Sequence, residues 1–349
     1  MQKRKNQHYV PQFYLRNFSK NNDEKTIGLY NPKNDLFIES TSIKNQSSKD
    51  FFYGKDGKIE KGLSEIENIL APKLAKLIST DSLPNKNSDD HISLLIFAIL
   101  TDLRNPIQIE QIKSFSDLMN QEINAFGKFD NNLSNFVPEI SHEFAVELSF
   151  ENYEGILKIC MDLDFKLLIN KSKRAFISSD FPVVKYNQFL ENKEIHGSRT
   201  GYSTLGLQIF LPLNSKMCIM FYDSTVYKVG NRKDKSIELN ESDVNQLNVL
   251  QILNCSHNVY FNEEVDKEYV NELIQNSKKY EKANRTTSSS HGVMKNDKIQ
   301  ENEQIIHIRS ADFLTKLSIT RIKYTRRANN IDLGNGISPL RPKAQMLIE

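Results

Sequence analysis

The sequence lacks tryptophan, has few cysteines and contains no long apolar run. The three cysteines, Cys160, Cys218 and Cys255, are far apart and odd in number, so they fit neither a structural zinc site nor a disulfide framework. No stretch reaches the roughly 18 consecutive apolar residues of a membrane-spanning helix. The basic N-terminal residues lead into no apolar segment typical of a signal peptide. We therefore expect a cytoplasmic protein with buried, reduced thiols and no membrane partner, while the absence of tryptophan excludes no function.

The charge balance and the glycine pattern argue against a strongly basic nucleic-acid-binding protein and against a glycine-rich phosphate-binding loop. The formal net charge of the 349 residues is +2, so no global field attracts nucleic acid. The spacing of Gly197, Gly201 and Gly206 fits neither standard phosphate-binding glycine fingerprint. The length and the 38% hydrophobic content suit a globular protein of one large domain or two ordinary ones.

Hydrophobic periodicity predicts an α+β fold, with a helical block in the first half, antiparallel β-hairpins in the second and a basic C-terminal extension. In the first half we expect a hairpin of residues 26–30 and 35–39, and helices over 8–18, 59–80, 92–103, 106–126 and 137–150. In the second half we expect hairpins of 166–170 with 174–178 and of 207–213 with 216–223, strands at 227–229 and 259–261, and helices over 242–254 and 263–281.

A polar stretch divides the predicted domains. Residues 278–304 are poor in large apolar side chains, so they are predicted to form a linker without a packed core. The main α+β domain would then span 1–277, and the basic C-terminal extension 305–349, with strands at 304–309 and 317–325.

The opening phrase, residues 8–18, reads HYVPQFYLRNF. Pro11 suits the first turn of a helix, because its missing N–H is unneeded there. His8 precedes that turn, and its imidazole titrates near neutrality, so it can act as a base, an acid or a metal ligand. The alternative is that His8 bonds a backbone group and fixes how the N-terminus docks.

This phrase resembles the opening of a microbial family known as domain of unknown function 4238, whose hallmark is His-Tyr-Val-Pro. Other segments are similar to that family in their order: Glu60 and Glu67, LRNP at 103–106, FISSDFPV at 176–183 and FLPL at 210–213. The resemblance covers roughly residues 8–265 and leaves out the tail. It implies a family and no reaction.

Asp180 is the strongest carboxylate candidate. It follows the apolar residues 175–177, and Pro182 stiffens the chain just beyond it, a common setting for chemistry at a strand end. Lys185 lies close by in sequence, as in some metal-dependent nucleases. The alternative is an Asx-turn, in which Asp180 bonds its own backbone.

Arg104 and two glutamates are the other candidates. Arg104 either complements the dipole at a helix C-terminus or clamps a phosphate or carboxylate. Glu60 and Glu67 are seven residues apart and share a helix face. Together with Asp180 they would be the ligands of a metal, and Mg²⁺ suits such carboxylates. The alternative for the two glutamates is a solvated helix face.

The tail carries the clearest charge signal. Its candidate nucleic-acid contacts are Lys316, Arg321, Lys323, Tyr324, Arg326 and Arg327. Such a basic strip can follow phosphates while the aromatic ring stacks on a base. The alternative is a solvated edge strand protected by charge.

Three functional hypotheses follow. The first is an enzyme acting on nucleic acid, a nuclease-type effector of bacterial defence, with His8, Asp180 and Arg104 as catalytic residues. The second is a non-catalytic module that binds nucleic acid, a protein partner or a second copy of the chain. The third is a nucleotide-modifying transferase in which Arg104 holds a diphosphate. The enzyme hypotheses require His8, Arg104 and Asp180 to line one pocket.

Overall fold

The computed structural model describes residues 5–125, 138–195, 197–280, 287–295, 298–309, 313–333 and 336–348. The fold is mixed α+β, as predicted. The helices are α1 (Gln12–Leu15), α2 (Lys58–Thr80), α3 (Asp89–Leu103), α4 (Pro106–Ala125), α5 (His142–Glu151), α6 (Tyr153–Cys160), α7 (Glu241–Asn254), α8 (Lys267–Ser277) and α9 (Pro342–Ile348).

The strands form one five-stranded sheet, one four-stranded sheet and three two-stranded pairs among the described residues. In chain order they are β1 (Asn6–His8), β2 (Thr26–Asn31), β3 (Leu36–Ser42), β4 (Ser48–Asp50), β5 (Asp164–Asn170), β6 (Ser178–Ser179), β7 (Val184–Tyr186), β8 (Gln208–Asn214), β9 (Met217–Tyr222), β10 (Tyr227–Val229), β11 (Ser236–Leu239), β12 (Val259–Phe261), β13 (Thr287–Lys295), β14 (Lys298–Arg309) and β15 (Ile322–Tyr324).

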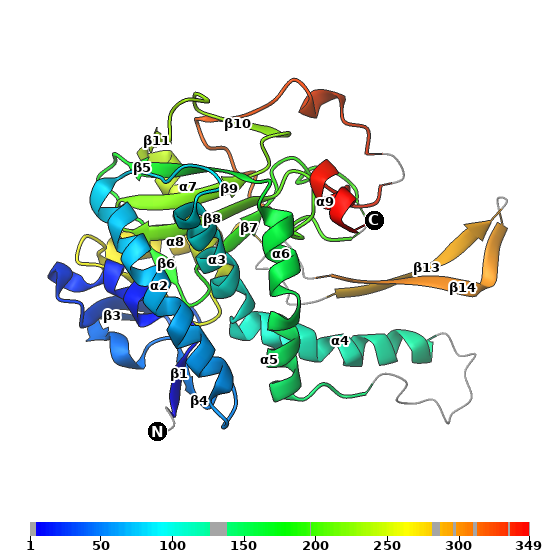
Figure 1. Ribbon diagram of the computed structural model, residues 1–349, viewed down its shortest axis with the longest axis horizontal. Helices are drawn as coiled ribbons and strands as arrows, with labels where there is room; N and C mark the ends of the chain where they lie inside the picture. The colour runs from blue at the N-terminus through cyan, green and yellow to red at the C-terminus, as the bar shows by residue number, and fades with distance from the viewer. Residues whose placement is uncertain are drawn as a thin grey trace.

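The five-stranded sheet, in the order β11-β5-β9-β8-β7, is the centre of the molecule (Figure 1). Its strands pair antiparallel except β11 with β5, which are parallel. Alternate side chains of β9 enter two different cores: Ile219 and Phe221 pack with residues of α2 and α3, whereas Cys218 and Met220 pack with residues of α7. Side chains alternate between the two faces of a strand, so a strand whose two faces are both covered by helices has a continuously apolar sequence.

The four-stranded sheet, in the order β3-β2-β12-β6, carries the chain up to Asp180. β12 is a central strand here, pairing antiparallel with β2 and with β6. Gly28 of β2 lies so close to β12 that a Cβ atom there would be 2.4 Å from the Phe261 ring. The glycine thus permits the close approach of the two strands.

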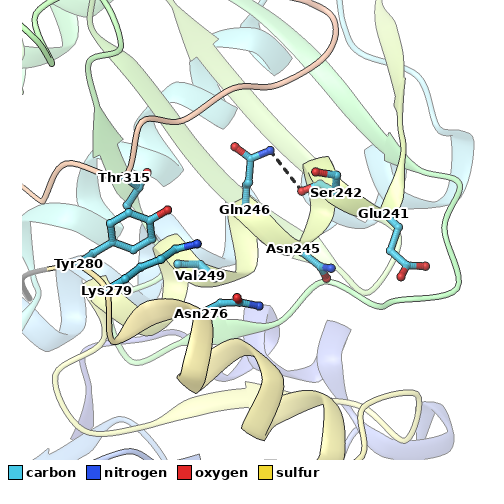
Figure 2. A pocket seen from close by; sticks show the side chains of 9 residues that line it. All are labelled: Glu241, Ser242, Asn245, Gln246, Val249, Asn276, Lys279, Tyr280 and Thr315. Carbon is cyan, nitrogen blue, oxygen red and sulfur yellow. Dashed lines mark hydrogen bonds between the residues drawn. The ribbon is translucent and has the colours of Figure 1, made fainter.

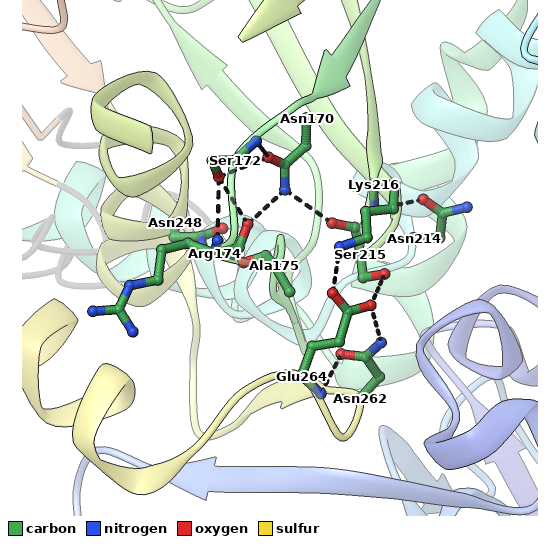
Figure 3. A network of polar contacts seen from close by, with 10 residues as sticks. All are labelled: Asn170, Ser172, Arg174, Ala175, Asn214, Ser215, Lys216, Asn248, Asn262 and Glu264. Carbon is green, nitrogen blue, oxygen red and sulfur yellow. Dashed lines mark hydrogen bonds and ion pairs between the residues drawn. The ribbon is translucent and has the colours of Figure 1, made fainter. Parts of the chain in front are cut away.

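The hairpin predicted from 166–170 and 174–178 is wrong. β5 pairs with β9 and β11, and β6 pairs with β12. The residues between them form a turn held by side-chain amides (Figure 3): Asn170 Nδ2 donates to Arg174 O at 2.6 Å, and Asn248 Nδ2 donates to Ala175 O at 2.8 Å. Asn248 Oδ1 also accepts from Ile177 N at 3.0 Å. Because these amides satisfy the backbone, the segment needs no partner strand.

Most other elements match the predictions, with differences at the ends. The hairpins β2–β3 and β8–β9 and the helices α2, α3 and α4 lie close to the expected ranges. The helix expected over 8–18 is instead the short α1 followed by a 3₁₀ turn. α7 begins one residue earlier than expected, because Asn240 and Asp243 form a capping box. α5 and α8 are shorter than predicted, and Ser141 and Asp266 cap their N-termini.

The C-terminal part differs most from expectation. The segment predicted as a polar linker contains part of the antiparallel hairpin β13–β14, which extends from the body beside α4 (Figure 1). Residues 313–320, which we call the strap, then cross α7, and Phe313, Leu317 and Ile319 enter the same core as α7. Residues 313–333 thus pack on the main body, while the division at 277 and 304 stays a prediction.

No described helix is by itself long and apolar enough to cross a membrane. Only α3 and the first part of α4 together meet that criterion, as a pair bent by 53°.

Candidate functional site

His8 lies at the end of β1 and is held by hydrogen bonds. Its Nε2 atom lies 3.0 Å from the carbonyl oxygen of Lys44 and 3.0 Å from Gln12 Nε2. The carbonyl of His8 accepts from the Tyr53 hydroxyl at 3.1 Å. These contacts fit the structural alternative, in which His8 fixes how the N-terminal strand docks.

Asp180 is buried at the end of β6 and serves as an acceptor for a neighbouring loop. Its carboxylate accepts backbone N–H groups from Ser256 (2.8 Å), His257 (2.8 Å) and Asn258 (3.2 Å). Its own N–H donates to Asn258 O at 2.9 Å. In place of the alternative Asx-turn, in which the aspartate would bond its own local backbone, Asp180 forms a clamp on a distant segment. The imidazole Nδ1 of His257 lies 3.6 Å from the same carboxylate, and these contacts fit a structural role.

Arg104 is buried at the C-terminus of α3 and pairs with one of the predicted glutamates. Its Nη1 atom lies 2.6 Å from Glu67 Oε1, whose side chain is 31% exposed. Among the described residues, the buried Nε and Nη2 atoms of Arg104 have no hydrogen-bond partner. The following residue, Asn105, donates to the carbonyl of Asp180 at 2.7 Å, which ties the end of α3 to the Asp180 clamp.

The predicted catalytic and metal residues therefore have different neighbours. Glu60 lies two turns before Glu67 on α2, but Glu67 is engaged by Arg104. Within the described ranges, no group of three or more His, Cys, Asp or Glu side chains is arranged to hold a metal ion. A shared pocket for His8, Arg104 and Asp180, and a Mg²⁺ site, both stay predictions.

Lys185 pairs with a carboxylate that the sequence analysis missed. Its Nζ atom lies 2.7 Å from Oδ2 of the buried Asp102. The sequence had suggested Asp180 as its neighbour, because the two residues are close along the chain. The Tyr202 hydroxyl donates to the same oxygen at 2.5 Å, and the Lys185 ammonium lies 4.5 Å from the Tyr202 ring centroid. Burial, followed by the charge of Asp102, raises the pKa of Tyr202 well above its usual value, so this hydroxyl remains a neutral donor. An acidic residue that directly follows the apolar run of α3 was the available signal.

The three cysteines are buried and free, as predicted. Burial raises the pKa of Cys160 to about 12, and it raises the pKa of Cys218 further. Neither thiol is activated as a nucleophile.

Two of the predicted nucleic-acid contacts, Lys323 and Tyr324, lie on a small antiparallel pair, and Arg321, Arg326 and Arg327 flank it in the chain. β15 pairs with β10, and the register places Lys323 directly opposite Lys228. Tyr227 and Val229 of β10 are buried, so Lys228 points to the opposite, solvent side, where it is exposed. Directly opposite like charges are destabilising, because their Cβ atoms are roughly 5 Å apart.

The basic side chains around this pair are exposed. We call the surface formed by Lys228, Arg321, Lys323, Arg326 and Arg327 the basic ribbon. In the described part of the chain, none of these five side chains forms an ion pair. Within the described ranges, the surface is therefore a concentration of positive charge whose members have no ion-pair partner.

Tyr324 and Lys316 differ in their relation to the ribbon. Tyr324 is 49% exposed, its ring centroid lies 5.8 Å from that of Tyr227, and its hydroxyl donates to Gln188 O at 2.9 Å. Tyr324 therefore lies on the face of β15 that packs on Tyr227, opposite the Lys323 side chain, where it is fixed in place with one part open to solvent. Lys316 is exposed on the strap, before the ribbon begins.

Another tail residue proves to be structural. Arg341 is buried, and its Nε atom donates to both carboxylate oxygens of Asp162 at 3.1 and 2.9 Å. It also donates to the carbonyls of Thr204 and Ile159. Arg341 anchors the C-terminal residues to the body and contributes no surface charge.

The chain matches the family model described as "Protein of unknown function (DUF4238)" over residues 6–265, and it belongs to that family. No curated protein and no solved structure matches it. β10 lies inside the matched range, whereas β15 and the strap lie beyond it.

Proposed function

We propose that the protein binds single-stranded nucleic acid through the basic ribbon. The observation that carries the proposal is the direct opposition of Lys228 and Lys323 on β10 and β15. Two exposed like charges at this spacing repel each other, and a phosphate backbone bound across the pair would relieve that repulsion.

The surroundings of this pair also support the proposal. Arg321 precedes β15, and Arg326 and Arg327 follow it, so the positive charge continues along the chain at both ends of the strand. The residues from Lys316 to Leu333 contain one acidic residue, Asp332. A row of cations suits the regularly spaced phosphates of a strand better than it suits a single anion.

Tyr324 favours a single strand over a duplex. Its hydroxyl is held by Gln188 O, and its ring is about half exposed. Unpaired bases stack on aromatic rings, whereas the bases of a duplex are stacked on each other.

The test is the salt dependence of oligonucleotide binding, measured by fluorescence anisotropy with a labelled single-stranded oligonucleotide. We expect the Lys228→Ala, Lys323→Ala double variant to lower the slope of log affinity against log salt by about 1.4, since each single-strand phosphate contact contributes roughly 0.7. The matched control removes two exposed lysines elsewhere, Lys33 and Lys49, and should leave the slope unchanged. Equal slopes for the wild type and the double variant would remove the ribbon from the binding surface.

The nuclease and defence hypothesis stays a separate prediction. The residues named for catalysis are engaged as described above, and no observation favours hydrolysis. The same mixtures, incubated with and without Mg²⁺ and run on a denaturing gel, test it directly. Intact oligonucleotide in every lane would favour the non-catalytic module.

A further inference from the structure

A pocket of about 390 Å³ lies between α7 and α8, away from the residues considered so far (Figure 2). Its volume is near the lower end of the roughly 300–1,000 Å³ of small-molecule sites. The lining residues are Glu241, Ser242, Asn245, Gln246, Val249, Asn276, Lys279, Tyr280 and Thr315.

The walls of the pocket are fixed by the fold. Gln246 exchanges hydrogen bonds with the strap: its Nε2 atom donates to Ser318 O at 2.9 Å, and its Oε1 atom accepts from Ser318 N at 2.8 Å. Asn245 Oδ1 accepts from the Tyr269 hydroxyl at 2.6 Å, which orients that amide and leaves its Nδ2 group as a donor. The polar groups of the pocket are thus held in place by the packing of α7 against α8 and the strap.

Two polar side chains of the lining are unused by the protein. Among the described residues, neither the partly buried Asn276 amide nor the exposed Ser242 hydroxyl has a hydrogen-bond partner, and both line the pocket. Each of these groups can donate and accept at once. Alcohol hydroxyls do the same, so the lining matches a ligand that carries several of them.

The charges of the lining cancel. Figure 2 shows Glu241 at one end of the pocket and Lys279 at the other, with the amides between them. The Glu241 carboxylate also lies 3.9 Å from Arg174 Nε, so an incoming ammonium group would meet a cation there. The lining itself therefore carries no net charge, which suits a neutral ligand.

Tyr280 supplies an apolar surface at the Lys279 end. The Lys279 ammonium lies 5.1 Å from the Tyr280 ring centroid, and the buried Val249 adds an aliphatic wall. A sugar ring has both kinds of surface, since its C–H face packs on an aromatic ring while its hydroxyls reach the polar groups.

From these contacts we infer that the α7–α8 pocket binds a neutral ligand with a sugar ring and vicinal hydroxyls, either a free monosaccharide or the ribose of a nucleoside. The inference is independent of the basic ribbon, because the two surfaces share no residue.

The experiment is a calorimetric titration of the full chain with D-glucose, D-ribose, adenosine and 2′-deoxyadenosine, and with the zwitterion glycylglycine. Saturable millimolar binding of the first three is expected, and the relative affinities of sugar and adenosine identify the source of the ring. Binding of 2′-deoxyadenosine should be at least tenfold weaker than that of adenosine, because a site that pairs a hydroxyl rejects the analogue without it. Preferential binding of glycylglycine, or no saturable binding by any of the sugars or by adenosine, would overturn the inference.

Variants of α8 locate the site. Asn276→Ala should weaken binding about fivefold to tenfold, the usual effect of one lost hydrogen bond. Asn276→Phe should abolish it by filling the pocket. Asn271→Ala removes the same group from an exposed position of the same helix and should bind as the wild type does. Wild-type affinity in both Asn276 variants would place the ligand elsewhere and contradict the inference.

Discussion

Replacing Asp180 by asparagine tests whether this residue is structural or chemical. Its side chain is buried, and its carboxylate accepts three successive backbone N–H groups, those of Ser256, His257 and Asn258. Asparagine keeps one acceptor oxygen and turns an NH₂ group toward at least one backbone donor. The variant therefore loses at least one bond to a charged acceptor and weakens the others.

The expected magnitude follows from these contacts. A hydrogen bond to a charged group contributes about 1.5–3 kcal/mol, and a buried donor left unpaired adds its own desolvation cost. We expect Asp180→Asn to lower the free energy of unfolding by about 3 kcal/mol. With an m-value of about 3 kcal/mol/M, the urea midpoint should fall by about 1 M.

The assay is equilibrium unfolding in urea, followed by circular dichroism. The control is Asp117→Asn, an exposed aspartate on α4, which should change the free energy of unfolding by less than about 0.5 kcal/mol. If Asp180 were kept as a base or a metal ligand, asparagine would relieve a buried charge and stability would hold or rise. A midpoint equal to or above that of the wild type would refute the structural role.

Two further predictions concern buried ionisable groups. Arg341→Met should lower the free energy of unfolding by about 3–5 kcal/mol, because it leaves the carboxylate of Asp162 without its cationic partner; a loss below about 1 kcal/mol in urea would contradict this. Burial, with a smaller contribution from the charge of Lys86, lowers the pKa of His91 from 6.5 to about 4. Between these two pKa values the unfolded chain binds a proton at His91 more readily than the folded chain does. The free energy of unfolding is therefore unaffected by this proton above pH 6.5 and decreases as the pH falls toward 4. His91→Asn should reduce this loss, as measured by urea midpoints at pH 7 and pH 5, and an identical pH dependence in the variant would show that other groups cause it.

Elements defined by neighbouring residues could be predicted from the sequence. The body of α3 was predicted from the apolar residues 92–103, and it begins slightly earlier, at Asp89, because the Ser88 hydroxyl accepts from His91 N at 3.3 Å. The β8–β9 hairpin was predicted from two apolar runs around Asn214 and Ser215. In both cases the signal lies within a few residues of the structure it determines.

Long-range pairing could not be predicted in this way. The side-chain amide of Asn248, on α7, bonds Ala175 O and Ile177 N, and β5 pairs with β9 and β11 instead of with residues 174–178. The apolar runs on either side of residues 171–173 looked like a hairpin because nothing local revealed that distant donor. The strands of the linker region were missed because their composition is polar.

The candidate sites show the same limit. The charge run of the tail revealed the β15 half of the basic ribbon, and Lys228 was missed because only the β10–β15 pairing brings it opposite Lys323. Asp180 was chosen for its place at a strand end, yet its partners, residues 256–258, come from a distant loop. Residue type and spacing thus identified polar positions, but the backbone around them decided their roles.

The most direct test of the proposed function is to map where a bound strand touches the protein. A photo-reactive single-stranded oligonucleotide is crosslinked to the full chain, and the attached peptides are identified by mass spectrometry. Our account predicts crosslinks in the peptides that contain Lys228 and the segment from Lys323 to Arg327, reduced in the Lys228→Ala, Lys323→Ala variant. Crosslinks confined to other surfaces, and unchanged in that variant, would contradict it.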